Sequence, residues 1–383
     1  MANILVLGAG YASLSFIKNV PQTLFDQHHF TLISNTNKHC ANILLHEIAS
    51  GIKTDYLFDL NDILPKKVCF IQDEIIEIKQ DSVIGNTAQY AYDFLIVGLG
   101  FMSDDFNIKG VSQHTYAISH SQNALYLHVQ LIQALKTHDL KNPFNLVVCG
   151  GGFSGIEILG ALKDNLPMLL KQLHLPSLYI QLSCIEAMPS ILPMFSPKLV
   201  KKALNYLHKQ GIMVYTNHKI LECQEKQIHT EKDHQKSVIP TDFTIWTCGV
   251  KGNIVIGSSS LFKSDHNRVE VNEFLNPKCL NAPNIFILGD CAALRDRENQ
   301  ARFYPPSAQL ASQMGYYVAL NFENILNHNA IPPFIFKPKG TICSLSSRYT
   351  IGYVGQLNLS GLIASLFKRY TENKWKKFLL YKN

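Results

Sequence analysis

Two glycine-rich segments have the spacing of dinucleotide-binding turns, and the first of them lies near the N-terminus. It reads GAGYAS at positions 8–13 and follows the apolar run at 3–7. Gly8 and Gly10 allow a tight turn and let the backbone approach a pyrophosphate at the start of a helix. Ser13 stands where a third glycine usually gives close helix–strand packing, and it is small enough to substitute. This context favours a dinucleotide site over an ordinary strand–helix turn.

The second glycine-rich segment, GGGFSG at positions 150–155, is a complete GxGxxG motif. It follows the apolar run at 145–149 directly and precedes a long helical stretch. Gly150, Gly152 and Gly155 hold the three positions that the motif requires. The segment therefore predicts a second dinucleotide site.

An acidic residue, Glu186, ends the next strand-like run after the second turn. A carboxylate there would accept both ribose hydroxyls of NAD and would repel the 2′-phosphate of NADP. Glu186 lies 36 residues after Gly150, more than the usual spacing of about 20, and an elongated helix that includes residues 165–173 accounts for the excess. No basic residue occurs from 187 to 197. The pattern predicts NADH as the substrate, the alternative being a solvated strand end.

The segments that must position these turns alternate between predicted strands and helices. The predicted strands lie at 3–7, 30–33, 94–97, 145–149, 178–184, 243–246 and 285–288. Such alternation implies an α/β fold with parallel sheets, here two Rossmann-like dinucleotide-binding domains. Two nucleotide sites in one chain usually serve hydride transfer from a nicotinamide to a flavin.

The composition excludes several other classes of protein. The chain has 383 residues, 46% of them apolar and 17% charged, which is a globular composition. The segment 368–383 contains six Lys/Arg and one Glu, so it carries +5 of the net charge of +6. A nucleic-acid-binding surface over the whole protein is therefore not expected. The nine cysteines include no CxxC motif, which argues against a zinc ribbon and a local redox dithiol.

Seven segments resemble, in the same order, those of the type II NADH dehydrogenases, the single-subunit, non-pumping NADH:quinone oxidoreductases. These segments are FTLISNTNKHCANILLHEIASG, DFLIVGLG, VVCGGGFSGIEILGAL, IWTCGV, IFILGDCA, PPSAQLASQ and KPKGTICSL. The resemblance implies FAD as cofactor, NADH as substrate and a membrane quinone as acceptor. It also implies an FAD-binding domain at 1–112 and 255–325, an NADH-binding domain at 113–254, and a membrane-associating C-terminal segment at 326–383.

The resemblance further implies roles for individual residues. Those expected to hold FAD are Gly8, Gly10, Ser13, Asp290 and, at the start of the helix that faces the flavin, Ala308. Those expected to hold NADH are Gly150, Gly152, Gly155 and Glu186. Those expected at the flavin and the quinone are Glu157, Gln309, Gln313 and Lys339.

Several positions depart from the pattern of the family, among them Ile43, which replaces a proline. The acid that normally ends the second strand and binds the FAD ribose is Ser34 here. Ser34 or Asn35 can still form a hydrogen bond with a hydroxyl group, without the assistance of a full charge.

The helix expected at 308–321 begins after a Pro-Pro-Ser sequence. Ser307 is a suitable N-cap, and the free N–H groups of the first turn would face the flavin. Gln309 and Gln313 are four residues apart and therefore share one face of the helix, where their amides could bind a quinone carbonyl. The alternative is a pair of polar residues on a surface helix.

Glu157 follows the second glycine turn and is expected in the first turns of a helix. Burial would raise its pKa, so that it could relay protons to the quinone or order the nicotinamide. The sulfide-oxidising relatives carry a cysteine at the Glu157 position. Cys343 alone cannot form their redox pair.

The C-terminal segment combines an apolar stripe with positive charge. Its apolar residues recur at helical spacing and are Leu359, Leu362, Ile363, Leu366, Phe367 and Tyr370. Ser360 is expected to cap this helix, and Lys368 and Arg369 are expected to follow its end. The segment is too short to span a bilayer and predicts a helix lying on an anionic membrane. The alternatives are a helix docked on the protein's own core with a solvated basic end, and an acidic protein partner. Deletion of residues 360–383 is expected to release the protein from membranes and to leave FAD bound.

Three readings of the function stay open at this point. The first is a peripheral membrane enzyme on the cytoplasmic side that passes electrons from NADH to a quinone. The second is a soluble reductase of a protein acceptor such as ferredoxin, and the third is a non-enzymatic flavoprotein sensor. A homodimer is possible in each case.

Overall fold

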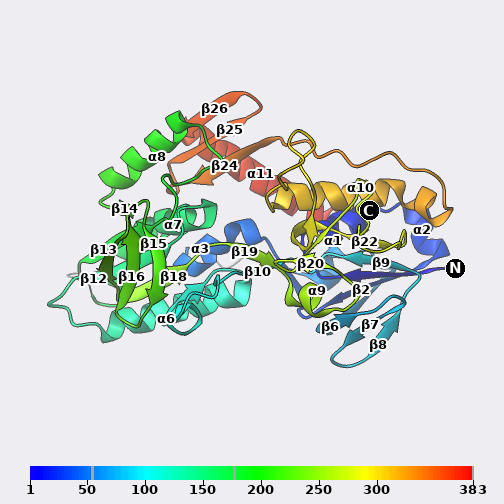
Figure 1. Cartoon of the computed structure of the whole chain (residues 1–383), viewed down its shortest axis with the longest axis horizontal. Helices are drawn as coiled ribbons and strands as arrows, with labels where there is room; N and C mark the ends of the chain where they lie inside the picture. The colour runs from blue at the N-terminus through cyan, green and yellow to red at the C-terminus, as the bar shows by residue number, and fades with distance from the viewer. Residues whose placement is uncertain (53–55, 176–177, 382–383) are drawn as a thin grey trace.

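Two five-stranded parallel sheets form the molecule's two halves, the first sheet on the right of Figure 1 and the second on the left. The computed structural model describes residues 1–52, 56–175 and 178–381. The strands of the first sheet, in spatial order, are β22 (Ile285–Ile287), β9 (Phe94–Val97), β1 (Asn3–Leu7), β2 (His29–Ser34) and β5 (Val68–Gln72). Those of the second sheet are β11 (Tyr116–Ala117), β18 (Phe243–Trp246), β12 (Phe144–Cys149), β13 (Ile180–Ile185) and β14 (Met213–Tyr215).

These strands confirm the predicted α/β class. Each of the seven predicted strands is present, with ends that differ by at most two residues. The first sheet takes its strands from both ends of the sequence, and the second takes its strands from the middle. Strands β10 (Phe101–Ser103) and β19 (Val250–Gly252) pair antiparallel where the chain passes between the sheets. The domain boundaries at 112/113 and 254/255 stay a prediction.

The described residues also form six smaller sheets of two or three strands each. Besides β10 with β19, they contain β3 (Lys38–Cys40), β4 (Leu57–Asp59), β6 (Ile75–Ile78), β7 (Ser82–Gly85), β8 (Gln89–Ala91), β15 (Lys219–Cys223), β16 (Gln227–Lys232), β17 (Gln235–Pro240), β20 (Ser264–Asp265), β21 (Arg268–Glu270), β23 (Ala292–Ala293), β24 (Gly340–Ser344), β25 (Thr350–Val354) and β26 (Leu357–Gly361).

The helices lie around these sheets. They are α1 (Tyr11–Asn19), α2 (Gln22–Gln27), α3 (Leu45–Ser50), α4 (Leu60–Ile63), α5 (Val111–His114), α6 (Ser121–Thr137), α7 (Phe153–Gln172), α8 (Pro197–Lys209), α9 (Ile254–Ser258), α10 (Ala308–Leu326) and α11 (Leu362–Leu380), with short 3-10 turns at Asn42–Leu44 and Gly289–Cys291.

Helices α1 and α10 pack closely against each other because α10 has a glycine, Gly315, at the contact. A Cβ atom on Gly315 would lie 2.0 Å from the carbonyl oxygen of Ala12, so only glycine permits this approach. The hydroxyl of Ser307 accepts a hydrogen bond from the Leu310 amide at 3.1 Å, which confirms the predicted cap of α10. The start of α10 is thereby held close to the first glycine turn.

The C-terminal helix differs from the prediction in three ways. Gly361 precedes its first residue without a side-chain cap, and Ser360 lies in β26, so the predicted Ser360 cap is wrong. The helix continues to Leu380, so Lys368 and Arg369 lie inside it rather than after its end. The Lys368 side chain is buried. No helix in the described part of the chain is long and apolar enough to cross a membrane.

Candidate active site

The first glycine turn has an open surface that fits a pyrophosphate. Gly8 has φ = +82°, and a Cβ atom there would lie 2.5 Å from the oxygen of Gly98. Gly10 precedes α1 without a side-chain cap, and a Cβ atom on it would meet only the Gly98 oxygen, at 3.8 Å. The Ser13 hydroxyl is buried and donates to the oxygen of Leu7 at 3.2 Å. The first N–H groups of α1 are therefore available to an anion.

Ser34 and Asp290 lie at the ends of the sheet strands near this turn, Ser34 as the last residue of β2 and Asp290 in the 3-10 turn that follows β22. Ser34 is buried at the end of β2, where its hydroxyl lies 3.5 Å from the amide of Thr36. Burial raises the pKa of Asp290 to about 6 although Arg268 opposes the shift. A carboxyl group in such a setting fits a hydroxyl-bearing ligand, as the ribityl chain of FAD would be.

The second glycine turn is held against Glu186. Oε2 of Glu186 accepts a hydrogen bond from the Gly151 amide at 2.6 Å, and Oε1 accepts one from Met188 at 2.8 Å. Gly152 precedes α7 without a side-chain cap, and no atom lies within 4 Å of a Cβ built on it. A Cβ on Gly155 would lie 1.9 Å from the oxygen of Gly150. The carboxylate thus stands beside an open turn, where a ribose would lie.

Gln309 and Gln313 bind the main chain that leads into β24. The amide of Gln309 accepts from Lys339 N at 2.6 Å and donates to Gly340 O at 3.2 Å. The amide of Gln313 accepts from Lys337 N at 3.1 Å and donates to Lys337 O at 3.0 Å. Both side chains therefore position this segment, and each has one further N–H.

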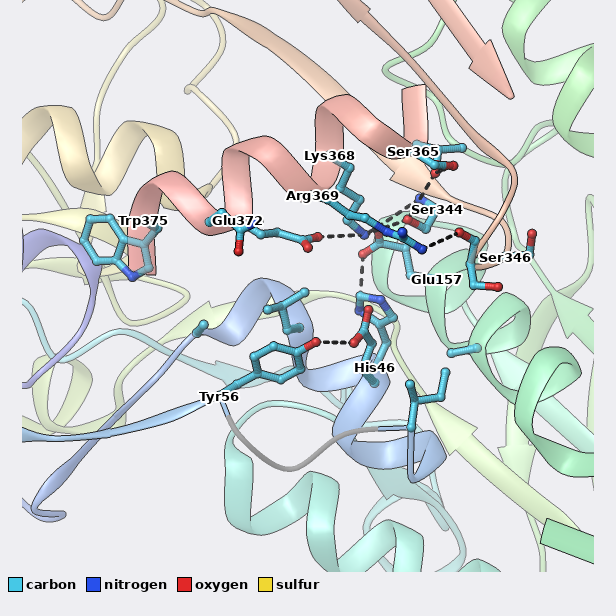
Figure 2. Close-up of a pocket in the computed structure, with 18 of the residues that line it drawn as sticks. His46, Tyr56, Glu157, Ser344, Ser346, Ser365, Lys368, Arg369, Glu372 and Trp375 are labelled. Atoms are coloured by element: carbon cyan, nitrogen blue, oxygen red, sulfur yellow. Dashed lines mark hydrogen bonds and ion pairs between the residues drawn. The ribbon is translucent and has the colours of Figure 1, made fainter. Parts of the chain in front are cut away.

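Glu157 lies at the centre of a buried charge cluster (Figure 2). Lys368 of α11 donates to its Oε1 at 2.5 Å, and Nδ1 of His46 lies 3.6 Å from its Oε2. The amide of Ser344 donates to Oε1 at 3.1 Å, and Lys368 also donates to the Ser344 hydroxyl at 2.8 Å. The cluster joins α7, α11, α3 and β24.

The raised pKa predicted for Glu157 is wrong. Burial alone would raise the pKa of Glu157, but the Lys368 ammonium, the nearby His46 and the hydrogen bonds from Lys368 and Ser344 lower it. Burial tends to lower the pKa of Lys368, and the neighbouring carboxylates outweigh this and raise it. Burial lowers the pKa of His46 to about 4. At neutral pH the pair is therefore Glu157 carboxylate and Lys368 ammonium, beside a neutral imidazole.

A cavity of about 450 Å³ opens beside this cluster. His46, Glu157, Lys368 and Glu372 line it, and so does Tyr56, whose hydroxyl donates to the Glu47 carboxylate. Burial raises the pKa of Glu372 to about 7, with Lys368 opposing the shift and Glu47 and Glu157 adding to it. The cavity therefore has an acid–base group, Glu372, that changes protonation near neutral pH.

The predicted acceptor-side residues lie in two places. Glu157 lines the cavity, and Gln309, Gln313 and Lys339 do not. Strand β24 connects the α10 glutamines with the cavity. Its first residue, Gly340, accepts a hydrogen bond from Gln309, and its last, Ser344, donates one to Glu157. Four residue steps of about 3.3 Å separate these ends by about 13 Å.

Sequence reasoning missed His46, Lys368 and Glu372. His46 lies in the HEIASG segment, which carried the resemblance without being assigned a role. Lys368 was counted as part of a basic tail. Nothing in its local sequence indicates a partner 211 positions earlier.

Replacement of Lys368 by Met should destabilise the fold by roughly 3 kcal/mol, because it leaves a buried carboxylate without its main partner. The Glu157→Gln/Lys368→Met double variant should recover most of this loss. Without Lys368 the pKa of Glu157 in the folded protein rises. The single variant should therefore lose stability as the pH rises above the pKa of an ordinary carboxyl group. Urea unfolding at pH 5 and pH 8 measures both effects, and equal losses in the single and double variants would contradict the ion-pair account.

Comparison with known proteins places these features in a family. The pyridine nucleotide-disulphide oxidoreductase family model matches residues 2–315. A type II NADH:quinone oxidoreductase of Staphylococcus aureus is 33% identical, over 97% of this chain and 94% of that protein.

Two solved structures share the fold. NDH2 from Plasmodium falciparum, in complex with NADH, has a TM-score of 0.87 at 20% identity, over 98% of this chain and 94% of that one. The sulfide:quinone oxidoreductase of Aquifex aeolicus has a TM-score of 0.81 at 18% identity, over 99% of this chain and 92% of that one. The fold, the two open glycine turns and the matched sequence lead to one assignment. The chain belongs to the type II NADH:quinone oxidoreductases within the pyridine nucleotide-disulphide oxidoreductase family.

Proposed function

We propose that this protein transfers two electrons from NADH, through non-covalently bound FAD, to a membrane quinone, and that it pumps no protons. The observation that carries the proposal is the pair of open glycine turns together with a cavity lined by a buried Glu157–Lys368 pair. FAD, when bound, supplies the carrier that takes a hydride from NADH and gives two electrons to the acceptor. The protein must bind both nucleotides and deliver a proton to the quinone.

The FAD site is assigned to the first glycine turn and the strand ends around it. Gly8, Gly10 and Ser13 would hold the pyrophosphate, Ser34 the ribose and Asp290 the ribityl region. The carboxyl group of Asp290, with its pKa of about 6, can serve as a hydrogen-bond partner for a hydroxyl in either protonation state. Ala308 begins α10, whose positive end would stabilise negative charge on the reduced flavin.

The NADH site is assigned to Gly150, Gly152, Gly155 and Glu186. The carboxylate of Glu186 is already aligned by two backbone amides, so it is fixed in place before a ribose arrives. Its charge would repel a 2′-phosphate at the same position.

The protein should therefore prefer NADH to NADPH. The Glu186→Gln variant should have a smaller difference in kcat/KM between the two nucleotides. The substitution removes the repulsion and keeps a group that can bind a hydroxyl. The ratio of kcat/KM for the two nucleotides, measured with one quinone, gives the result. An NADPH preference in the unmodified protein would show that Glu186 does not meet the ribose.

The quinone side is assigned to the region between α10 and the cavity. Gln309 and Gln313 hold residues 337–340, and their remaining N–H groups are candidates for a quinone carbonyl. Lys339 contributes its backbone amide to this arrangement, and its side chain is exposed. We assign all three to positioning of the acceptor.

Reduction of a quinone to a quinol by NADH takes up one proton from water, because the hydride of NADH supplies the other hydrogen, and the buried cluster can deliver that proton. Lys368 carries a proton at neutral pH, and Glu157 holds its ammonium group at 2.5 Å. Glu372 lies one helical turn further along α11, 3.9 Å from Lys368, and its side chain is more exposed than that of Lys368. We assign to Lys368 the transfer of a proton toward the acceptor and to Glu372 its resupply from water.

Glu157→Gln and Glu372→Gln should slow reoxidation of the flavin by quinone by about tenfold or more and leave its reduction by NADH nearly unchanged. Because only protonated Glu372 can resupply Lys368, the rate of the quinone step should fall as the pH rises through about 7. Glu372→Gln should lack this pH dependence, and Glu323→Gln on α10 serves as the control. Stopped-flow measurement separates the two half-reactions, and equal losses in both would contradict the assignment.

Membrane association is proposed through one face of α11. Leu362, Ile363, Leu366 and Tyr370 share this face and are each 64–71% exposed, so these four residues of the predicted stripe do not pack into the protein core. The other two differ from the prediction, because Leu359 lies in β26 and Phe367 is partly buried. Exposed apolar side chains in such a row mark a binding surface. Lys368 no longer belongs to the charges that face a membrane, because it is buried against Glu157.

Helix α8 extends this surface with positive charge. Its exposed face contains Lys198, Lys201, Lys202 and Lys209. The Lys202 ammonium donates to the hydroxyl of Ser360, in the strand just before α11, at 2.9 Å. Each lysine near an anionic membrane adds about 1 kcal/mol at low salt. Attachment to the cytoplasmic face of the membrane and a homodimer stay predictions.

Ile363→Asp/Leu366→Asp should release the protein from vesicles that contain anionic phospholipid, because it places charge on the face that would enter the lipid. Lys198→Glu/Lys201→Glu/Lys209→Glu should weaken binding at low salt. The control Lys66→Glu/Lys232→Glu/Lys236→Glu changes the charge equally on other exposed lysines. Flotation assays measure binding, and full-length protein that fails to float at low salt would contradict the proposal.

A further inference from the structure

We infer that helix α11 is part of the FAD site, with Trp375 and His39 as positioning residues for the pyrophosphate-binding turn. The inference rests on the proposed binding of FAD at Gly8–Ser13. It goes beyond that proposal because it makes FAD affinity depend on a C-terminal helix, whereas the sequence predicts that deletion of residues 360–383 leaves FAD bound.

A chain of two hydrogen bonds connects α11 to the turn. Nε1 of Trp375 donates to Nε2 of His39 at 3.1 Å, and Nδ1 of His39 lies 2.7 Å from the oxygen of Ala9. Because Trp375 can only donate and a carbonyl can only accept, the imidazole carries its proton on Nδ1 and is neutral. Burial lowers the pKa of His39 to about 4, so this state persists at neutral pH. Ala9 lies between the two glycines of the turn.

Ring contacts support the same part of the turn. The rings of Trp375 and Tyr11 are 4.6 Å apart, and those of His39 and Tyr11 are 5.5 Å apart in an edge-on arrangement. Tyr11 is the first residue of α1 and follows Gly10 directly. Trp375 therefore packs against the first residue of the helix whose free N–H groups would face the pyrophosphate.

The other end of α1 is also attached to α11. Lys18, in the last turn of α1, is buried and donates to the oxygen of Leu379 at 3.1 Å and to that of Tyr381 at 2.6 Å. These are carbonyl groups at the C-terminal end of α11, where a cation is favourable. The Leu379 side chain is fully buried in the same core as α1. Helix α11 thus contacts α1 at both of its ends.

The attachment of α11 to α1 matters more in this protein than in flavoproteins that bind the ribose of FAD with an acidic residue. Ser34 supplies no charge at that position, so a larger part of the affinity must come from the turn and the start of α1. A turn held in its binding conformation costs less to order when the ligand binds. Since coupling of two equilibria is reciprocal, FAD should in turn stabilise the docking of α11.

The test is titration of FAD into FAD-stripped full-length protein, followed by flavin fluorescence. Trp375→Phe keeps the ring and removes the hydrogen bond, so Kd for FAD should rise about fivefold. Trp375→Leu also removes the aromatic contact with Tyr11, and Kd should rise by more than tenfold. Tyr370→Ala, on the exposed face of the same helix, is the matched control and should leave Kd unchanged.

Amide hydrogen exchange supplies a second readout that does not involve activity. Exchange in residues 362–380 should be faster in FAD-stripped protein than in FAD-loaded protein. Equal exchange in both forms, or a Kd for FAD that is the same in the unmodified protein and both Trp375 variants, would overturn the inference alone. Absence of FAD binding by the unmodified protein would overturn the proposed function as well.

Discussion

The ion pair between Glu157 and Lys368 is the interaction on which the arrangement of the site depends. Two charges removed from water are stable only when each is paired and hydrogen-bonded, and here the Ser344 amide, the Ser344 hydroxyl and His46 complete the set. The pair fixes α11 to α7 and β24, and residues of α11 form part of the wall of the cavity. The same helix is anchored to α1 by Lys18. One helix thereby connects α1 and α7, the two helices that follow the glycine turns.

Helix α11 has two chemically different faces, and each has its own task. The inner face carries Lys368, Trp375 and Leu379 against the protein, and the outer face exposes Leu362, Ile363 and Leu366. A helix that closes a site with one face and offers apolar side chains with the other can place that site at a bilayer surface. A quinone dissolved in the bilayer would then have a short path to the acceptor side of the enzyme.

The local features of this protein were predictable because they have local causes. Buried parallel strands appear as apolar runs, the glycine turns require glycine for backbone reasons, and Ser307 caps α10 through an amide three residues away. Contacts between distant segments were not predictable. The sequence indicates the apolar face of α11, but it places Lys368 in a basic tail because the partner of Lys368 lies 211 positions earlier. The predicted rise in the pKa of Glu157 is wrong for the same reason. The sequence indicates that Glu157 is buried, but it does not indicate that the Lys368 ammonium lies beside it.

The central claim is that electrons pass from NADH to a quinone through FAD bound to this chain. The most direct measurement is a steady-state assay of the purified protein, stripped of FAD and then reconstituted, with NADH and a water-soluble short-chain quinone. The account predicts that NADH and quinone are consumed in equal amounts, and that turnover requires added FAD. Reconstituted protein that consumes no NADH, or that consumes NADH at a rate independent of the quinone, would contradict it.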